Sequence, residues 1–214
     1  MLKTASIHRV VFLSLFVAVA TSGLTLGQTQ TASNAGGTPQ NDIGHDIQAY
    51  LLMASSDPVG KNKVPASLDN VTRQLTAALG PNNYSLLARY IYSVKDGGSI
   101  EATGIDNFGI TSPALAAKPT YYGFHFETVT FSVAKGQSII QMRHMKFGMS
   151  VPIASSIQNT VTKDAAESFQ YHDVSITTEL NLPEGIPTVV GTMNINQPDK
   201  LLILVLMIKR SQAK

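Results

Sequence analysis

The chain contains no cysteine, and this absence excludes several kinds of chemistry at once. Without thiols there are no disulfide bonds, no thiolate zinc sites and no cysteine nucleophile. The acylated cysteine that anchors a bacterial lipoprotein is missing as well. The protein must therefore be stabilised by its buried core. The roughly 190 residues beyond the N-terminal segment are enough for one substantial core or two small ones.

Charge is also scarce, because only 14% of the residues are charged, whereas soluble domains typically have about 25%. The 16 basic and 14 acidic residues nearly balance. A nucleic-acid-binding protein would show a basic patch or stripe, so this class is excluded. Low charge together with many Thr, Ser and Asn residues favours an exported, β-rich protein over a cytosolic enzyme.

The common catalytic motifs are absent from the sequence. There is no G-x-S-x-G elbow, no S-x-x-K motif and no P-loop. The histidines beyond the N-terminal segment are scattered, and none forms the H-x-x-x-H spacing of a helical metal site. The carboxylates are isolated too. We therefore assign no catalytic residue, no metal site and no cofactor, and the sequence favours a non-catalytic role.

The first twenty residues have the three parts of a secretory signal peptide. Lys3, His8 and Arg9 form a basic start. Val10 to Ala20 is an apolar run interrupted only by Ser14, and it ends in small residues that suit cleavage. The run is too short for a membrane-spanning helix. An uncleaved anchor that lies in the membrane interface is the alternative.

Residues 21–42 follow as a polar segment rich in Gly, Thr and Gln, which is typical of a flexible tether. A cleaved signal and a tether predict a protein that is exported and becomes periplasmic or extracellular. We expect no transmembrane helix in the mature chain, because the later apolar runs are too short.

A first folded unit of order β-α-β-β is predicted over 43–105. Residues 46–54 are apolar and fit a buried strand or a short helix. Residues 67–79 form the clearest helix, because Leu68, Val71, Leu75 and Leu79 recur on one face. Ser67 is expected to cap this helix, and Gly80 to end it.

The rest of this unit consists of strands. Residues 85–94 alternate as a strand. Asp96-Gly97-Gly98 is a tight-turn signal, so residues 99–104 are predicted to return as the next strand.

Residues 120–214 are predicted to form an antiparallel β unit, separate from 43–105 or continuous with it. Apolar residues stand at even positions before Glu127 and at odd positions after it, which indicates a bend or bulge there. Three methionines within 138–150 are assigned to packing rather than to a copper site. Residues 154–168 form a long polar loop or a short helix. Residues 201–208 are apolar throughout and predict a strand buried on both faces.

A few residues could contact a ligand or a partner protein. His125 and Glu127 share one strand face, and Tyr121 lies earlier on the same strand. His172 and Asp173 lie on a later strand. Core packing and cross-strand pairing explain such aromatic residues equally well. We predict Tyr121, His125, Glu127, His172 and Asp173 as candidate contacts.

Two stretches resemble parts of the secretin family, the outer-membrane channels of type II and type III secretion. VSITTELNLPEGIPTVVGT, followed after a turn by LLILVLMIKR, is similar to a late segment of that family. Thr192 stands where secretins usually have a second glycine. The β-α-β-β order of the first unit is similar to the small periplasmic modules of secretins. The resemblance implies a related module of the cell envelope.

The sequence predicts an α+β fold, mostly antiparallel β-sheet with one amphipathic helix packed on it. We expect an exported, non-catalytic envelope protein that acts in assembly or binding, with secretion among its contexts. A protein partner or self-association is expected. The alternatives are a carrier of a small apolar ligand with a β-lined pocket, and an exported hydrolase without a recognisable motif.

A different structural feature would favour each alternative. A cavity lined by Phe124, Phe131, Met142 and Leu180 would favour the carrier. Clustering of all five candidate contacts in one cleft would favour the hydrolase. A filled core with a regular, exposed edge strand would favour assembly.

Overall fold

The computed structural model describes residues 44–57, 62–80, 83–108, 110, 115, 117–134, 136–155, 168–197 and 199–211. The predicted signal peptide and tether, and most of the predicted loop at 154–168, lie outside these residues. All the described residues belong to one compact unit, 41–214.

Two antiparallel sheets form this unit. The first has the strand order β2-β1-β9-β8, built from β1 (Gly44–Ser55), β2 (Asn83–Lys95), β8 (Thr188–Asn194) and β9 (Lys200–Arg210). The second contains β3 (Ile100–Asp106), β4 (Thr120–Phe126), β5 (Thr128–Ala134), β6 (Gln137–Ser155) and β7 (Ser168–Pro183). One edge of the long strand β6 pairs with β4 and β5, and β6 also pairs with β7.

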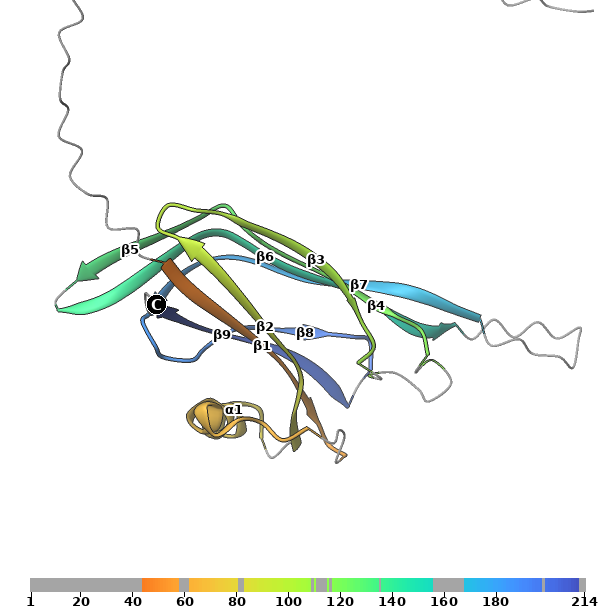
Figure 1. Ribbon diagram of the computed structural model, residues 1–214. Helices are drawn as coiled ribbons and strands as arrows, with labels where there is room; N and C mark the ends of the chain where they lie inside the picture. Colours follow the sequence, from red (N-terminus) through yellow and green to blue (C-terminus); the bar gives the residue numbers. More distant parts are fainter. Residues whose placement is uncertain are drawn as a thin grey trace, which may run out of the picture. The chain divides into compact units, whose positions relative to one another are not determined.

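The two sheets face each other across the main hydrophobic core (Figure 1). Alternate residues of β1 and β9, such as Leu51 and Leu204, point toward the second sheet and are fully buried. They pack with Phe124, Phe147 and Met142 from the second sheet. Met142, Met145 and Met149 are all buried, so the prediction that they serve packing is confirmed.

The other face of the first sheet is covered by helix α1 (Asp69–Leu79), which follows a 3-10 turn, Ala66–Leu68 (Figure 1). Val71 and Leu75 of the helix pack with Leu52 of β1 and Val205 of β9. Because β9 has the core on one face and the helix on the other, its residues Ile203 to Ile208 are all buried. The predicted double burial of 201–208 is therefore confirmed for most of the strand.

The helix differs from its prediction at both ends. It starts at Asp69, because the Leu68 N–H bonds to the Pro65 carbonyl in the preceding 3-10 turn. Ser67 lies inside that turn, and no side-chain cap bond forms. Leu79 is 42% exposed, since it lies at the last residue of the helix. Gly80 ends the helix at a φ of 83°, as predicted.

The partner of β3 also differs from the prediction. The turn at Asp96–Gly98 forms, with Gly97 at a φ of 75°. However, β2 and β3 belong to different sheets, and β3 pairs with β4. The turn therefore carries the chain from one sheet to the other. Each sheet combines strands from both predicted units. The division of the chain into units at 43–105 and 120–214 stays a prediction.

The observed fold is α+β, with mostly antiparallel sheet and a single short α-helix among the described residues. Within this part of the chain, no helix has both the length and the apolar character needed to cross a membrane.

Candidate functional site

A groove of about 480 Å³ crosses the outer face of the second sheet. Its floor is one row of small residues that pair across four strands. Gly123 of β4 lies opposite Gly148 of β6, and the row continues to Thr103 of β3 and Ser175 of β7. The groove therefore runs across the strands, at right angles to the chain direction.

The first wall of the groove carries charged and ionisable side chains. It lies two residues along each strand from the floor. Glu101, His125 and Lys146 are neighbours there, on β3, β4 and β6. An acid, an imidazole and a base thus stand side by side along one rim.

The second wall combines an aromatic ring with a hydroxyl and a carboxylate. Tyr121 pairs with Ser150, and Ser150 pairs with Asp173 on β7. The Ser150 hydroxyl donates a hydrogen bond to the Asp173 carboxylate. This bond leaves other lone pairs of the carboxylate available to a ligand in the groove.

Further aromatic rings extend the second wall. Tyr171 meets Tyr121 edge to face, with ring centroids 5.5 Å apart, and Phe169 packs on Tyr171 at 5.8 Å. The Lys118 ammonium lies 4.5 Å from the centre of the Phe169 ring. Partial burial and the neighbouring Tyr121 hydroxyl raise the pKa of Tyr171. Tyr121 and Tyr171 are 45% and 40% exposed, so their rings are open to a ligand.

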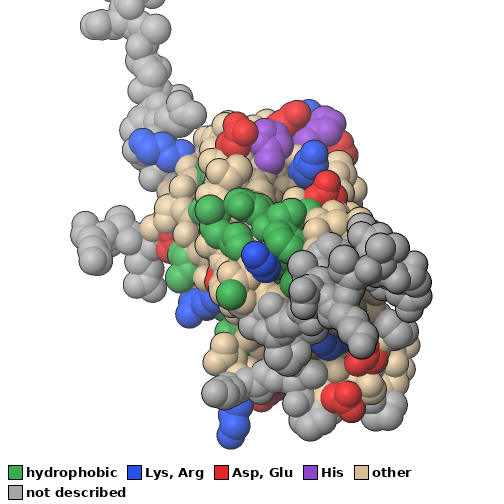
Figure 2. Space-filling model, turned by 90° about the vertical axis from the view of Figure 1, so that its right-hand side faces the viewer, with side chains coloured by type: hydrophobic (Ala, Val, Ile, Leu, Met, Phe, Trp, Pro, Cys, Tyr) green, Lys and Arg blue, Asp and Glu red, His purple; other side chains and the backbone are tan. Residues whose placement is uncertain are grey.

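Figure 2 shows one face of the unit on which hydrophobic side chains gather beside histidine, acidic and basic side chains.

Three of the five candidate contacts from the sequence, Tyr121, His125 and Asp173, line this groove. Glu127 instead binds His144, with Glu127 Oε2 2.8 Å from His144 Nδ1. Glu127 occupies the bend between β4 and β5, where a change of parity was predicted, and His144 lies in a bulge of β6 with a φ of 47°. His172 shares the sheet face of Val174 and Ile176, which pack on the core.

The cluster expected for a hydrolase is thus divided between the groove, a surface ion pair and the other face of the sheet. The residues expected for a carrier pocket are placed differently again. Phe124 lines the groove, whereas Phe131, Met142 and Leu180 do not, and Met142 is fully buried in the shared core. Among the described residues, no group of three or more potential metal-binding side chains is found.

The sequence did not predict the groove, because its floor consists of small residues that carry no charged, aromatic or metal-binding group. Gly123 and Gly148 lie in the interior of strands, and neither has a positive φ. An interior strand glycine often marks a place where a ligand or another backbone approaches closely. Two such glycines in paired strands were the available signal.

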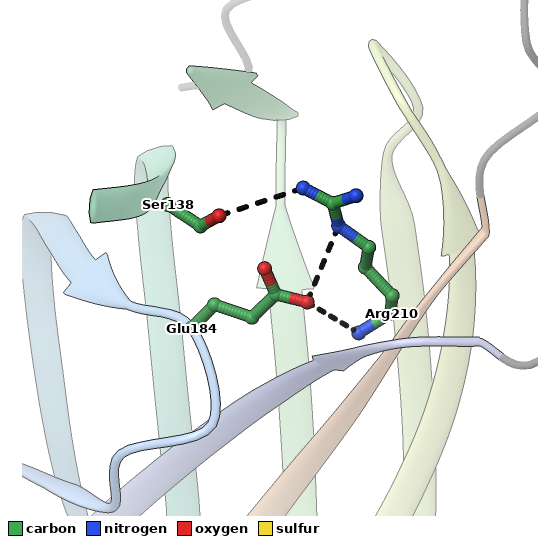
Figure 3. A network of polar contacts seen from close by, with 3 residues as sticks. All are labelled: Ser138, Glu184 and Arg210. Atoms are coloured by element: carbon green, nitrogen blue, oxygen red, sulfur yellow. Dashed lines mark hydrogen bonds and ion pairs between the residues drawn. The ribbon is translucent and has the colours of Figure 1, made fainter. Parts of the chain in front are cut away.

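A separate polar network joins the two sheets at one end of the unit (Figure 3). The side-chain Nε of Arg210 lies 3.3 Å from Glu184 Oε1, and the Arg210 backbone N–H donates to the same oxygen. The guanidinium also bonds to the Ser138 hydroxyl and lies 4.4 Å from the centre of the Phe131 ring. Its residues come from β5, β6, β9 and the β7–β8 turn, so its role is structural.

Secretins are among the solved structures that are similar to this chain. No family model matches the chain, and no curated protein matches its sequence. Among solved structures, it is similar to InvG, the secretin of the Salmonella SPI-1 type III secretion injectisome. The identity is 12% and the TM-score 0.33, over 80% of this chain and 63% of that one.

Two secretins of type II secretion give similar values. XcpQ of Pseudomonas aeruginosa is 10% identical with a TM-score of 0.33, over 80% of this chain and 57% of that one. GspD of E. coli K12 is 9% identical with a TM-score of 0.31, over 80% of this chain and 48% of that one. The chain spans less than two thirds of the length of these secretins. Secretins are thus the family that two sequence stretches resemble and the family to which these similar solved structures belong.

Proposed function

We propose that this protein is an exported, non-catalytic module of the cell envelope that assembles with other proteins through an edge of its second sheet. The observation that carries this proposal is strand β7, a sixteen-residue edge strand on a unit whose two sheets share one hydrophobic core. β7 pairs with β6, and no other described strand pairs with its second edge. A free edge of this length offers a row of backbone donors and acceptors to a strand of another chain.

Another edge of the same sheet is covered by the chain itself. The outer edge of β5 bonds to the turn between β2 and β3, through Gly97 N–H to Val129 O and Val129 N–H to Gly98 O. The Phe131 N–H bonds to the Asp96 carboxylate in the same turn. Protection of this kind is a usual way to prevent edge-to-edge pairing. β7 has no comparable cover among the described residues, and with sixteen residues it is longer than the other edge strands β2, β3 and β8, so we assign assembly to it.

The secretion context is part of the same proposal. It is supported by the late sequence segment that resembles secretins, because this segment includes most of β7 together with β8 and β9. The proposal also assigns the amphipathic helix α1 the task of covering one face of the first sheet.

Light scattering of the purified protein, with and without envelope extract, tests the assembly. We expect an oligomer or a stable complex with an envelope protein. Thr177→Lys combined with Glu179→Lys places two lysines on the exposed face of β7, and charged side chains on an edge strand oppose strand addition. This variant is expected to reduce the mass to that of the monomer.

Gln74→Lys combined with Ala78→Lys adds two lysines to the exposed side of α1 and serves as the control. The control should keep the assembled mass. A wild-type protein that is monomeric and binds no protein from the extract would contradict the proposal. Equal loss of assembly in both double variants would contradict the assignment to β7.

A further inference from the structure

We propose that the groove across the outer face of the second sheet binds an uncharged polysaccharide chain through its sugar rings and hydroxyl groups. This inference goes beyond the proposed assembly, because it assigns a ligand to a sheet face rather than a protein to a sheet edge. The residues that carry it are Tyr121, Ser150, Asp173, Glu101, His125 and Lys146, which form the two walls.

The shape of the groove suits an elongated ligand. It crosses β3, β4, β6 and β7, and because neighbouring strands lie about 4.8 Å apart, the row of four strands is roughly 14 Å long. The wall rows lie two residues on either side of the glycine row, so their Cα atoms are about 13 Å apart before side chains narrow the gap. A volume of about 480 Å³ is typical of a small-molecule site. A short stretch of a linear chain fits this open trough.

The charges of the walls favour an uncharged ligand. The walls carry two carboxylates, Glu101 and Asp173, and two ammonium groups, Lys146 and, beside Phe169, Lys118. A polyanion such as a nucleic acid would need a clear excess of basic groups, and a polycation would need an excess of acids. The groove has neither, so its charged groups are suited to hydrogen bonding rather than to charge pairing.

The backbone of the sheet cannot provide these hydrogen bonds. The floor residues of β4 and β6 pair on both sides with neighbouring strands, so their N–H and C=O groups are used within the sheet. A peptide lying across the strands would find no ladder to join. Recognition must therefore come from the side chains of the walls.

Those side chains match the two surfaces of a sugar. The C–H face of a sugar ring is apolar and packs flat on an aromatic ring, which the exposed Tyr121 and Tyr171 provide. Its hydroxyl groups both donate and accept. The carboxylates of Asp173 and Glu101 accept hydrogen bonds, whereas Lys146 donates them.

The two floor glycines support a binding role because nothing else in the fold requires them. A Cβ added at Gly123 would meet only Thr103 Cγ2, at 4.0 Å, and one added at Gly148 would lie 3.7 Å from its nearest neighbours. Larger residues would thus fit the sheet, and glycine weakens a strand interior. What a larger residue would remove is the space in the groove.

NMR titration of the purified, ¹⁵N-labelled protein tests this inference. The probes are the tetramer of N-acetylglucosamine and cellotetraose as neutral chains, with tetragalacturonate as a charged chain of similar size. We expect saturable shifts of the Gly123 and Gly148 amides with at least one neutral chain. Tyr121→Ala removes a stacking ring, and Gly148→Val fills the floor with a good strand former. Each should weaken binding by about tenfold or more.

Thr130→Val, on the exposed face of β5 outside the groove, is the control and should bind as the wild type does. Circular dichroism confirms that each variant is folded. Absence of saturable binding by both neutral chains would overturn the inference, as would equal or tighter binding of tetragalacturonate. Undiminished binding by folded Gly148→Val would overturn it too. None of these results depends on assembly through β7, so the two proposals can fail separately.

Discussion

The hydroxyl group of Tyr90 is buried without a hydrogen-bond partner among the described residues. Its ring lies between the sheets and packs on Tyr122, with centroids 4.5 Å apart. Burial, with Tyr122, Asp106 and Tyr92 nearby, raises the pKa of Tyr90 well above its usual range. An unsatisfied buried hydroxyl is unfavourable. Because the pKa of Tyr90 is higher in the folded chain than in the unfolded chain, this residue also makes the stability of the unit depend on alkaline pH.

Tyr90→Phe is expected to be at least as stable as the wild type near neutral pH, because it removes only the unpaired hydroxyl. Below about pH 10 the tyrosine is protonated in both states, and no pH dependence arises. Above that pH the unfolded chain loses the proton and the folded chain keeps it, so stability falls as pH rises. Urea unfolding at about pH 8 and pH 11 measures the difference.

The wild type should lose more free energy of unfolding over this interval than Tyr90→Phe, by up to about 1.4 kcal/mol per pH unit above 10. Tyr92 and Tyr171 also have raised pKa values and remain in the variant, so some slope should persist. An unchanged slope in Tyr90→Phe would contradict this account.

Gly104 on β3 is required by close packing. A Cβ at this position would lie 2.3 Å from the Tyr122 hydroxyl oxygen and 2.4 Å from the adjacent ring carbon. The Tyr122 ring cannot easily move away, because it packs on Tyr90. We expect Gly104→Ala to lower the free energy of unfolding by about 1–3 kcal/mol, measured by urea unfolding.

Gly123→Ala is the matched control for this prediction, since it changes the same residue type on the strand that pairs with β3. Its added Cβ has ordinary space, so stability should be unchanged or higher by up to about 1 kcal/mol. Equal losses in both variants would show that the Tyr122 contact is not the cause.

The elements were more predictable from the sequence than their partners. Apolar alternation in 174–182 and continuous apolarity in 201–208 report local burial, and local burial determines strand type. The partner of β3 was not predictable in this way. A tight turn such as the one at Gly97 normally brings the next strand back alongside the preceding one. Here the strand after the turn, β3, pairs instead with β4 of the second sheet, and the local sequence does not report this distant partner.

The candidate site shows the same limit. Tyr121 and Asp173 are brought together by the pairing of β4 and β7 with opposite edges of β6, which no periodicity reports. Glu127 was read as a neighbour of His125, but the bend it occupies turns it toward His144. Residue types indicated chemistry, whereas the register of distant strands decided which side chains meet.

Helix α1 offers a test of packing at the scale of an element. Leu75 is 6% exposed and packs with Leu52 and Val205, whereas Leu79 on the same helix is 42% exposed. Leu75→Ala is expected to lower the free energy of unfolding by about 2–4 kcal/mol, through lost burial and the cavity left behind. Leu79→Ala should change it by less than about 0.5 kcal/mol. Urea unfolding of both variants checks this, and similar losses would contradict the packing of α1 through Leu75.

At the scale of the whole molecule, the two sheets depend on each other. The main core takes side chains from both, and the Arg210 network joins their ends (Figure 3). The ion pair of Arg210 with Glu184 is partly exposed and contributes little by itself, about 0–1 kcal/mol. The shared core must therefore provide most of the coupling between the sheets.

This sharing predicts that residues 43–105 do not fold alone. A fragment with these ends would keep β1 and β2 but lose β9, and it would keep β3 without β4. Its inner face would expose Leu51 and Ile47 to water. We expect far-ultraviolet circular dichroism of the fragment to show an unfolded chain, whereas residues 41–214 unfold in one cooperative transition in which circular dichroism and tyrosine absorbance coincide. A cooperatively folded fragment, or two separate transitions in 41–214, would instead indicate two independent domains.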